Sequence, residues 1–106
     1  MENSSKLCIM LRIRTLEWST AIKRDYRRES KTYGKKKLDD LLADVLGDLM
    51  TDHLLPAKFK DHKLTGNWQD YRSCHVKPDL LLIYEKPDDE FLSLVRLGSH
   101  SEIYGK

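Results

Sequence analysis

Three histidines, His62, His75 and His100, occupy the last part of this 106-residue chain. Imidazole is the side chain whose ordinary pKa lets it both accept and donate a proton near neutral pH. The same part of the chain contains a carboxylate, Asp79, and an arginine, Arg96. Two or more imidazoles grouped with a carboxylate and a guanidinium predict acid–base chemistry on an anionic substrate.

Other interpretations of these residues stay open at this level. Two histidines and a carboxylate are also the ligand set of a facial metal site, and any one histidine alone is more commonly an ordinary surface or packed residue. The cysteines, Cys8 and Cys74, are only two and lie far apart, which excludes a zinc-type cluster. We expect neither a metal nor another cofactor. His53 is expected to end a helix and to have a structural role.

The first elements that must support these residues are a strand and a helix. Apolar residues alternate over residues 7–13, which predicts a strand that ends near Thr15. Ser19 or Thr20 then caps a helix that runs to about Thr32, and Gly34 ends it.

A second helix is predicted by the apolar residues that recur at helical spacing between Leu38 and Met50. A stripe of carboxylates follows another face of this helix: Asp40, Asp44, Asp48 and Asp52. Like charges at this spacing repel one another slightly, so we interpret the stripe as a solvated face and assign it no chemistry. The two helices should form an antiparallel hairpin.

The histidine-containing part is predicted to be a loop over residues 57–67, which carries His62, followed by strands over 68–76, 80–85 and 91–98. Residues 80–84 are continuously apolar, as expected of a central strand. The order β-α-α-β-β-β predicts an α+β fold, in which the two-helix hairpin packs against a small antiparallel sheet.

Composition predicts one soluble domain, because 40% of the residues are apolar and 34% are charged. No apolar run approaches the roughly 18 residues of a membrane span, and no signal-peptide pattern opens the chain. We therefore expect a cytoplasmic protein without a membrane partner. Cys8 and Cys74 fit a reducing compartment, and we expect no disulfide between them.

Positive charge is concentrated between residues 23 and 37, although the whole chain carries only +2. The basic residues of this segment are Lys23, Arg24, Arg27, Arg28, Lys31, Lys35, Lys36 and Lys37. Only Asp25 and Glu29 oppose them. Such a patch attracts a phosphate backbone. Taken by itself it is more commonly a solvated helix face followed by a basic turn, and it favours RNA binding only if another feature implies RNA.

A motif runs through the second half of the chain. It begins Lys60-Asp61-His62-x-Leu64-x-Gly66-x-Trp68-x-x-Tyr71-Arg72-x-x-His75-Val76-x-Pro78-Asp79 and ends Arg96-x-Gly98-Ser99-His100-Ser101-Glu102-x-Tyr104-Gly105. This motif resembles the YafQ branch of the RelE/ParE toxin superfamily. The resemblance implies a RelE-like toxin domain over residues 10–106, with residues 1–9 as an N-terminal extension.

The resemblance also implies a function. Members of this branch are toxins of bacterial type II toxin–antitoxin pairs, which enter the ribosomal A site and cut mRNA there. The expected partners are an antitoxin, the 70S ribosome and mRNA. We expect the basic patch of residues 23–37 to contact ribosomal RNA, and Arg72 to contact RNA as well.

The resemblance assigns function to His62, His75, Asp79 and His100, and Tyr104 occupies a position that is commonly Phe in close relatives. Arg96 matches a basic position near the scissile phosphate. RNA supplies its own nucleophile, the 2′-hydroxyl, so such an enzyme needs a base, an acid and a cation but no metal.

The roles can be ranked from the residues. If the last strand stays extended, Arg96 and His100 project to one face, and Asp79 could orient an imidazole or raise its pKa. We expect His100 to transfer a proton, followed by His75 with Asp79, and His62 to bind RNA. A ParE-type gyrase inhibitor of the same fold is the alternative function, and the histidines and Asp79 argue against it.

Overall fold

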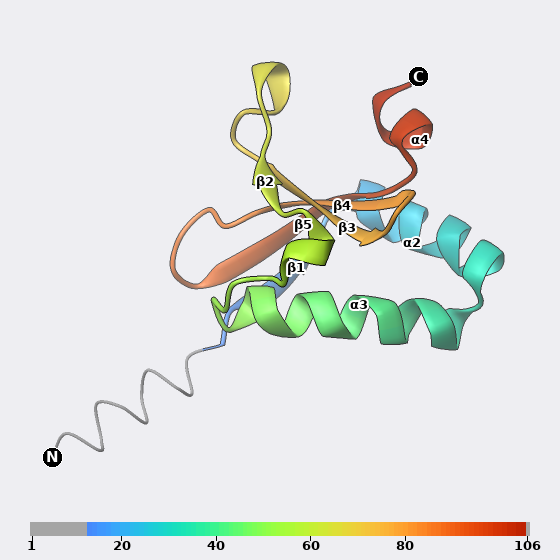
Figure 1. Ribbon diagram of the computed structural model, residues 1–106, viewed down its shortest axis with the longest axis horizontal. Coiled ribbons are helices and arrows are strands. Elements are labelled where there is room, and N and C mark those ends of the chain that lie inside the picture. The colour runs from blue at the N-terminus through green and yellow to red at the C-terminus, as the bar shows by residue number, and fades with distance from the viewer. Residues whose placement is uncertain (1–12, 106) are drawn as a thin grey trace, which may run out of the picture.

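A five-stranded sheet carries two long helices on one face and a short C-terminal helix on the other (Figure 1). The computed structural model describes residues 13–105. The helices are α2 (Thr20–Tyr33), α3 (Lys35–Met50) and α4 (His100–Tyr104), with single 3-10 turns η1 (Ala57–Phe59) and η2 (Gly66–Trp68). The strands are β1 (Thr15–Trp18), β2 (His62–Lys63), β3 (Arg72–Lys77), β4 (Leu80–Glu85) and β5 (Phe91–Gly98).

The strand order in the sheet is β1-β5-β4-β3-β2. All neighbouring pairs are antiparallel except β1 and β5, which are parallel. The α+β fold with a helical hairpin against the sheet is confirmed, and the sheet is mixed rather than purely antiparallel. The parallel pair arises because the α2–α3 hairpin carries the chain back across the sheet before the antiparallel strands begin.

Helices α2 and α3 form as their sequences predict. The Ser19 hydroxyl accepts a hydrogen bond from the Ile22 backbone N–H at 3.0 Å, which caps α2. Gly34 separates the helices with a positive φ of 86°, a conformation that glycine adopts without steric cost. The two helices pack on the sheet through buried residues that include Ile22, Leu38 and Val45.

Strand β4 lies at the centre of the sheet and is buried on both faces, as its continuous apolar run predicts. Its Leu80, Leu82 and Tyr84 face the α2–α3 layer. Its Leu81 and Ile83 face the other way, where Ile103 of α4 covers them. Each face of the sheet therefore has its own apolar cluster, and the second cluster seats α4.

Three predicted boundaries are wrong. The strand at residues 7–15 falls largely outside the described part of the chain, and the observed strand is Thr15–Trp18. The strand predicted from residue 68 begins at Arg72, because hydrogen bonds within residues 65–71 close two tight turns there. The predicted loop of residues 57–67 contains β2, which pairs with β3.

The end of the last strand also differs from the expectation. Strand β5 stops at Gly98, as predicted, but the chain does not remain extended to His100. Ser99 caps α4 instead, accepting a hydrogen bond from the Glu102 N–H while the Glu102 carboxylate accepts one from the Ser99 N–H. His100 is consequently the first residue of a helix. None of the helices described is long and apolar enough to span a membrane.

Candidate active site

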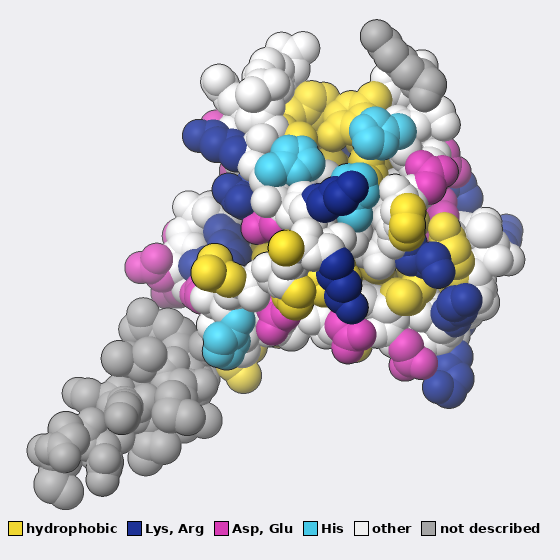
Figure 2. Space-filling model, in the orientation of Figure 1, with side chains coloured by type: hydrophobic (Ala, Val, Ile, Leu, Met, Phe, Trp, Pro, Cys, Tyr) yellow, Lys and Arg dark blue, Asp and Glu magenta, His cyan; other side chains and the backbone are white. Residues whose placement is uncertain are grey.

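Histidines from three different elements converge on one face of the protein. His62 of β2 and His100 of α4 line the same cavity of about 720 Å³, together with Trp68 and Tyr104. The His75 ring, carried by β3, lies 6.5 Å from the His100 ring between centroids. Figure 2 shows histidine side chains gathered on one face, around a Lys or Arg side chain and beside a hollow lined by hydrophobic side chains. The sequence placed these residues on separate elements, and the fold brings them together.

Backbone carbonyls orient two of the imidazoles. His62 Nδ1 lies 2.8 Å from the Lys60 carbonyl oxygen, and His75 Nδ1 lies 3.3 Å from that of Pro78. A carbonyl oxygen only accepts hydrogen bonds, so each Nδ1 must carry a proton and donate it. In the neutral ring the lone pair is then on Nε2, the nitrogen that remains available to take a proton.

Helix α4 places His100 beside Tyr104, which itself contacts Trp68. The His100 and Tyr104 rings lie 5.5 Å apart, one helical turn from each other. Tyr104 in turn contacts Trp68 edge-to-face, with centroids 5.5 Å apart. Burial raises the pKa of Tyr104, so its phenol stays protonated at neutral pH and can donate a hydrogen bond. The cavity is therefore lined by two imidazoles, those of His62 and His100, and by two aromatic rings, those of Trp68 and Tyr104.

Asp79 lies exposed in the turn between β3 and β4. Within residues 13–105 its carboxylate forms no hydrogen bond with an imidazole, and the hydrogen bond that orients the His75 ring comes from Pro78. The residue is close to the site but does not orient His75 directly in this structure.

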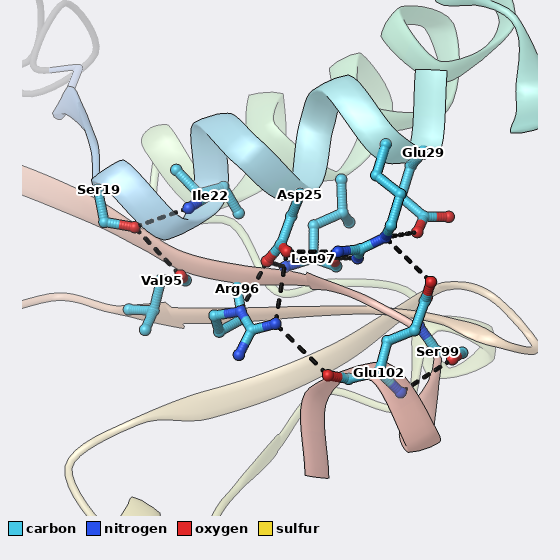
Figure 3. A network of polar contacts seen from close by, with 10 residues as sticks. Ser19, Ile22, Asp25, Glu29, Val95, Arg96, Leu97, Ser99 and Glu102 are labelled. Carbon is cyan, nitrogen blue, oxygen red and sulfur yellow. Dashed lines mark hydrogen bonds and ion pairs between the residues drawn. The ribbon is translucent and has the colours of Figure 1, made fainter. Parts of the chain in front are cut away.

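Arg96 belongs to a polar network that joins α2, β5 and α4 (Figure 3). Its Nε donates to the Asp25 carboxylate at 2.7 Å. Asp25 is fully buried and also accepts a hydrogen bond from the Leu97 backbone N–H at 3.0 Å. Strand β1 pairs with β5 only as far as Leu94, so the Asp25 side chain satisfies a backbone group of β5 that β1 does not reach. The guanidinium predicted to face the scissile phosphate is thus paired with a buried carboxylate.

Arg28 extends the same network to α4. Its guanidinium lies 2.9 Å from Asp25 and 3.0 Å from both Glu29 and Glu102, and it also donates to the Leu97 carbonyl. Glu102 is the residue that closes the cap of α4. Arg28, expected to contact RNA, instead links α2 to the helix that carries His100.

The network shifts the pKa of its carboxyl groups in opposite directions. Burial alone would raise the pKa of Asp25, but hydrogen bonds from Arg96, Leu97 and Arg28 outweigh burial and lower it. Burial and the nearby Glu102 raise the pKa of Glu29 against the pull of Arg28. The hydrogen bond from the Ser99 N–H lowers the pKa of Glu102.

The other predicted RNA-binding residues lie at three places, on the outer face of α2, at the start of α3 and on β3. Lys23, Arg24, Arg27 and Lys31 are exposed on the outer face of α2, and within the described residues none of their side chains forms an ion pair. At the start of α3, Lys35 pairs with Asp39 and Lys36 with Asp40, while Lys37 is exposed. Arg72 pairs with Asp61 at 3.2 Å, next to β2.

Sequence reasoning missed the residues of the network other than Arg28 and Arg96. A signal was present, because Asp25 and Glu29 fall at helical spacing from the inward-facing Ile22. A carboxylate on the apolar side of a helix must find a partner when buried. The partner on β5 could not be named without the fold, since Arg96 lies 71 positions away.

Metal ligation was the other chemistry that the sequence left open. In the part of the chain that the structure describes, no three His, Cys, Asp or Glu side chains are grouped so as to hold a metal ion. Cys74 is a free, buried thiol. The candidate site therefore consists of the imidazoles of His62, His75 and His100 and the aromatic rings of Trp68 and Tyr104.

Comparison with known proteins gives the family. A model of the family described as "Bacterial toxin of type II toxin-antitoxin system, YafQ" matches residues 14–105. The chain belongs to the YafQ family. It is 36% identical over 93 residues to the mRNA interferase toxin YafQ of Escherichia coli K12, covering 87% of this chain and 97% of that relative.

Solved structures of YafQ-family proteins and related toxins have the same fold. A metal-bound toxin from Helicobacter pylori superposes with a TM-score of 0.76 at 43% identity, covering 86% of this chain and 99% of that one. The E. coli DinJ–YafQ toxin–antitoxin complex superposes with a TM-score of 0.74 at 34% identity, covering 87% of this chain and 98% of that one. The suspected YafQ resemblance is confirmed.

Proposed function

We propose that this YafQ-family toxin is an mRNA interferase, an endoribonuclease that cuts mRNA in the ribosomal A site by histidine acid–base catalysis. The observation that carries the proposal is the convergence of three histidines from separate elements: His62 and His100 line one aromatic-walled cavity, and the His75 ring lies 6.5 Å from that of His100. The names of the relatives support the substrate, because the E. coli K12 relative is an mRNA interferase toxin.

The reaction follows from the chemistry of RNA. The 2′-oxygen attacks the adjacent phosphorus, the bond to the 5′-oxygen breaks, and a 2′,3′-cyclic phosphate forms. One imidazole takes the 2′-proton through its free Nε2, and a second, protonated imidazole gives a proton to the departing 5′-oxygen. The oriented ring of His75 and the nearby ring of His100 supply such groups, and His62, on the wall of the same cavity as His100, binds the RNA.

The remaining residues bind and position. Tyr104 and Trp68 provide ring surfaces on which a nucleotide base stacks beside His100. A protonated imidazole serves as the cation for the developing phosphorane charge. Arg96 contributes mainly through the position of α4 while its guanidinium is paired with Asp25, and Asp79 acts on the electrostatics of His75 from the adjacent turn.

An antitoxin is the proposed protein partner, on the basis of the DinJ–YafQ complex. It restrains the toxin in the cytoplasm until the toxin engages the ribosome. The exposed basic residues of α2 and the start of α3 are proposed to bind ribosomal RNA. No metal takes part in the proposed reaction.

The test is primer extension on an mRNA incubated with purified protein, with and without ribosomes. We expect cuts only when ribosomes are present, and at least a hundredfold loss of cutting for His100→Ala, because removal of one proton-transfer group costs about 10²–10⁴-fold in rate. Protein treated with EDTA and then desalted should cut as fast as untreated protein.

Two results would contradict the proposal. Cuts in free mRNA without ribosomes would exclude ribosome dependence. Full toxicity of the His100→Ala variant in bacteria would indicate that the protein acts by binding, as a ParE-type toxin does. A His53→Ala variant is the matched control, because His53 hydrogen-bonds Thr51 at the end of α3.

A further inference from the structure

A second cavity lies directly behind His75. It has a volume of about 470 Å³, is open to solvent on one side and is bounded by α3, η1 and the end of β3. The side chains relevant to its chemistry are Asp44, Lys58, Phe59, Lys60, His75 and Lys77. His75 lines this cavity, and its ring lies 6.5 Å from that of His100, so the cavity adjoins the candidate active site.

The lysines and the aromatic ring that line this cavity are residue types that bind nucleotides. Three lysines and one carboxylate give its wall a net positive charge, which favours a phosphodiester backbone. Phe59 is half-buried against the main core, and the Lys58 ammonium lies 5.1 Å from its ring centre. Single-stranded RNA stacks its bases on aromatic rings in positively charged grooves, and here a base would take the place of the exposed Lys58 side chain over the Phe59 ring.

Asp44 is exposed on the solvated acidic face of α3 and also borders this cavity. It belongs to the acidic stripe of α3, in which Asp40 pairs with Lys36. Asp44 itself forms no ion pair within residues 13–105, although it lines a cavity that contains three lysines. A phosphate group would be repelled by this carboxylate, whereas a base that offers N–H groups would not.

A carboxylate distinguishes the four bases by the donors that they offer. It only accepts hydrogen bonds, and guanine presents two adjacent donors, N1–H and the N2 amino group, on its Watson–Crick edge. In adenine and cytosine the amino group adjoins a ring-nitrogen lone pair, and in uracil the single N–H lies between two carbonyl oxygens. Those neighbouring acceptors repel a carboxylate.

We propose that this cavity is a nucleotide subsite that holds the base next to the scissile phosphate, stacks it on Phe59 and selects guanine through Asp44. The proposal rests on the proposed function, because it assumes an RNA strand that passes over His75. Lys58, Lys60 and Lys77 hold the flanking phosphates without regard to sequence.

The test uses the non-cutting His100→Ala protein and fluorescein-labelled UUGUU, UUAUU, UUCUU and UUUUU, with affinity measured by fluorescence anisotropy. We expect UUGUU to bind about fivefold or more tightly than UUUUU, the lower end of the discrimination that one bidentate pair supplies. Adding Asp44→Asn should abolish the preference for guanine and favour adenine, the base that asparagine recognises. Adding Phe59→Leu should weaken all four probes alike.

Asp40→Asn is the matched control, because it removes the same charge one turn earlier on α3 and outside the cavity. It should keep the preference for guanine. Equal binding of the four probes, or a preference that survives Asp44→Asn, overturns the subsite. If binding is selective for guanine but the wild-type protein leaves ribosome-bound mRNA intact, the subsite is supported and the nuclease function is contradicted. Cutting without selective binding overturns the subsite alone.

Discussion

At the scale of single residues, the least expected feature is the fully buried carboxylate of Asp25. A buried charge is tolerated when its lone pairs are occupied, and Asp25 accepts from Arg96, Arg28 and the Leu97 N–H. Because all three donors belong to α2 or β5, the carboxylate joins the helix to the strand that precedes His100. Its role is to hold the site together without touching substrate.

Asp25→Asn should therefore destabilise the protein. The amide keeps one acceptor but places an N–H₂ group against two guanidinium groups, and loss of one partner in a buried charged network costs about 3 kcal/mol in the free energy of unfolding. Urea unfolding at pH 7 measures this difference. The exposed, ion-paired Asp40→Asn serves as the control and should change stability by less than about 0.5 kcal/mol.

The pH dependence of the same pair of proteins checks the cause. A lowered pKa means that the Asp25 carboxylate stabilises the fold at pH values above its ordinary pKa of 3.8, and that this stabilisation is lost as pH falls through the lower, folded-state value. The stability gap between wild type and Asp25→Asn should shrink below about pH 4. A gap of the same size at pH 3 and pH 7 would show that shape, not charge, is responsible.

At the scale of elements, α4 determines where His100 lies. A helix of five residues is unstable alone, so its position depends on its cap and on contacts with other elements. The cap is the Ser99–Glu102 capping box, and Ile103 is buried against β4 while Tyr104 contacts Trp68. Arg96 donates a hydrogen bond to the Glu102 carbonyl, and the ion pair between Glu102 and Arg28 joins α4 to α2.

Glu102→Gln removes the ion pair with Arg28 and leaves the other contacts of α4 in place. Glutamine also completes a capping box, so α4 should form, but the ion pair with Arg28 is removed. Because the pair is partly exposed, we expect a loss in unfolding free energy below about 1 kcal/mol. Displacement of His100 relative to His75 should lower the single-turnover cutting rate roughly tenfold or more, since catalysis is sensitive to shifts of about 1 Å.

The control for Glu102→Gln is Glu17→Gln on β1, which makes the same chemical change to a carboxylate that, among residues 13–105, accepts a hydrogen bond only from Ser93. It should cut at the wild-type rate. If Glu102→Gln also cuts at the wild-type rate, then the capping box and the other contacts of α4 are enough to position it, and the ion pair with Arg28 contributes nothing to the site.

Elements that local sequence defines could be predicted from the sequence, whereas elements that depend on tertiary contacts, such as α4, could not. The predicted ends of α2, β4 and β5 were correct or nearly so, because local periodicity and caps define these elements. Strand β2 and helix α4 were missed, because contacts with β3, α2 and β4 stabilise these short segments. The grouping of His62, His75 and His100 came from family resemblance and topology rather than from local pattern.

At the scale of the whole molecule, charge and chemistry occupy different surfaces. The exposed basic residues lie along α2 and the start of α3, whereas the histidines lie where β2, β3 and α4 meet. The sequence predicted one continuous basic patch, but the fold divides it. Arg28 turns inward to the network, and Lys35 and Lys36 pair with carboxylates of α3. The outer face of α2 keeps lysines and arginines whose charges are uncompensated among the described residues.

This division predicts unequal contributions to ribosome binding. Replacing Lys23, Arg27 and Lys31 with Gln, or Lys35, Lys36 and Lys37 with Gln, removes three positive charges in either case. Each side chain that no longer neutralises a phosphate should reduce the slope of log affinity against log salt by about one. We expect the α2 set to flatten the slope more, because Lys35 and Lys36 must first leave Asp39 and Asp40. Co-sedimentation with 70S ribosomes over a salt series measures both slopes, and slopes equal to that of the wild type in both sets would exclude this surface from ribosome binding.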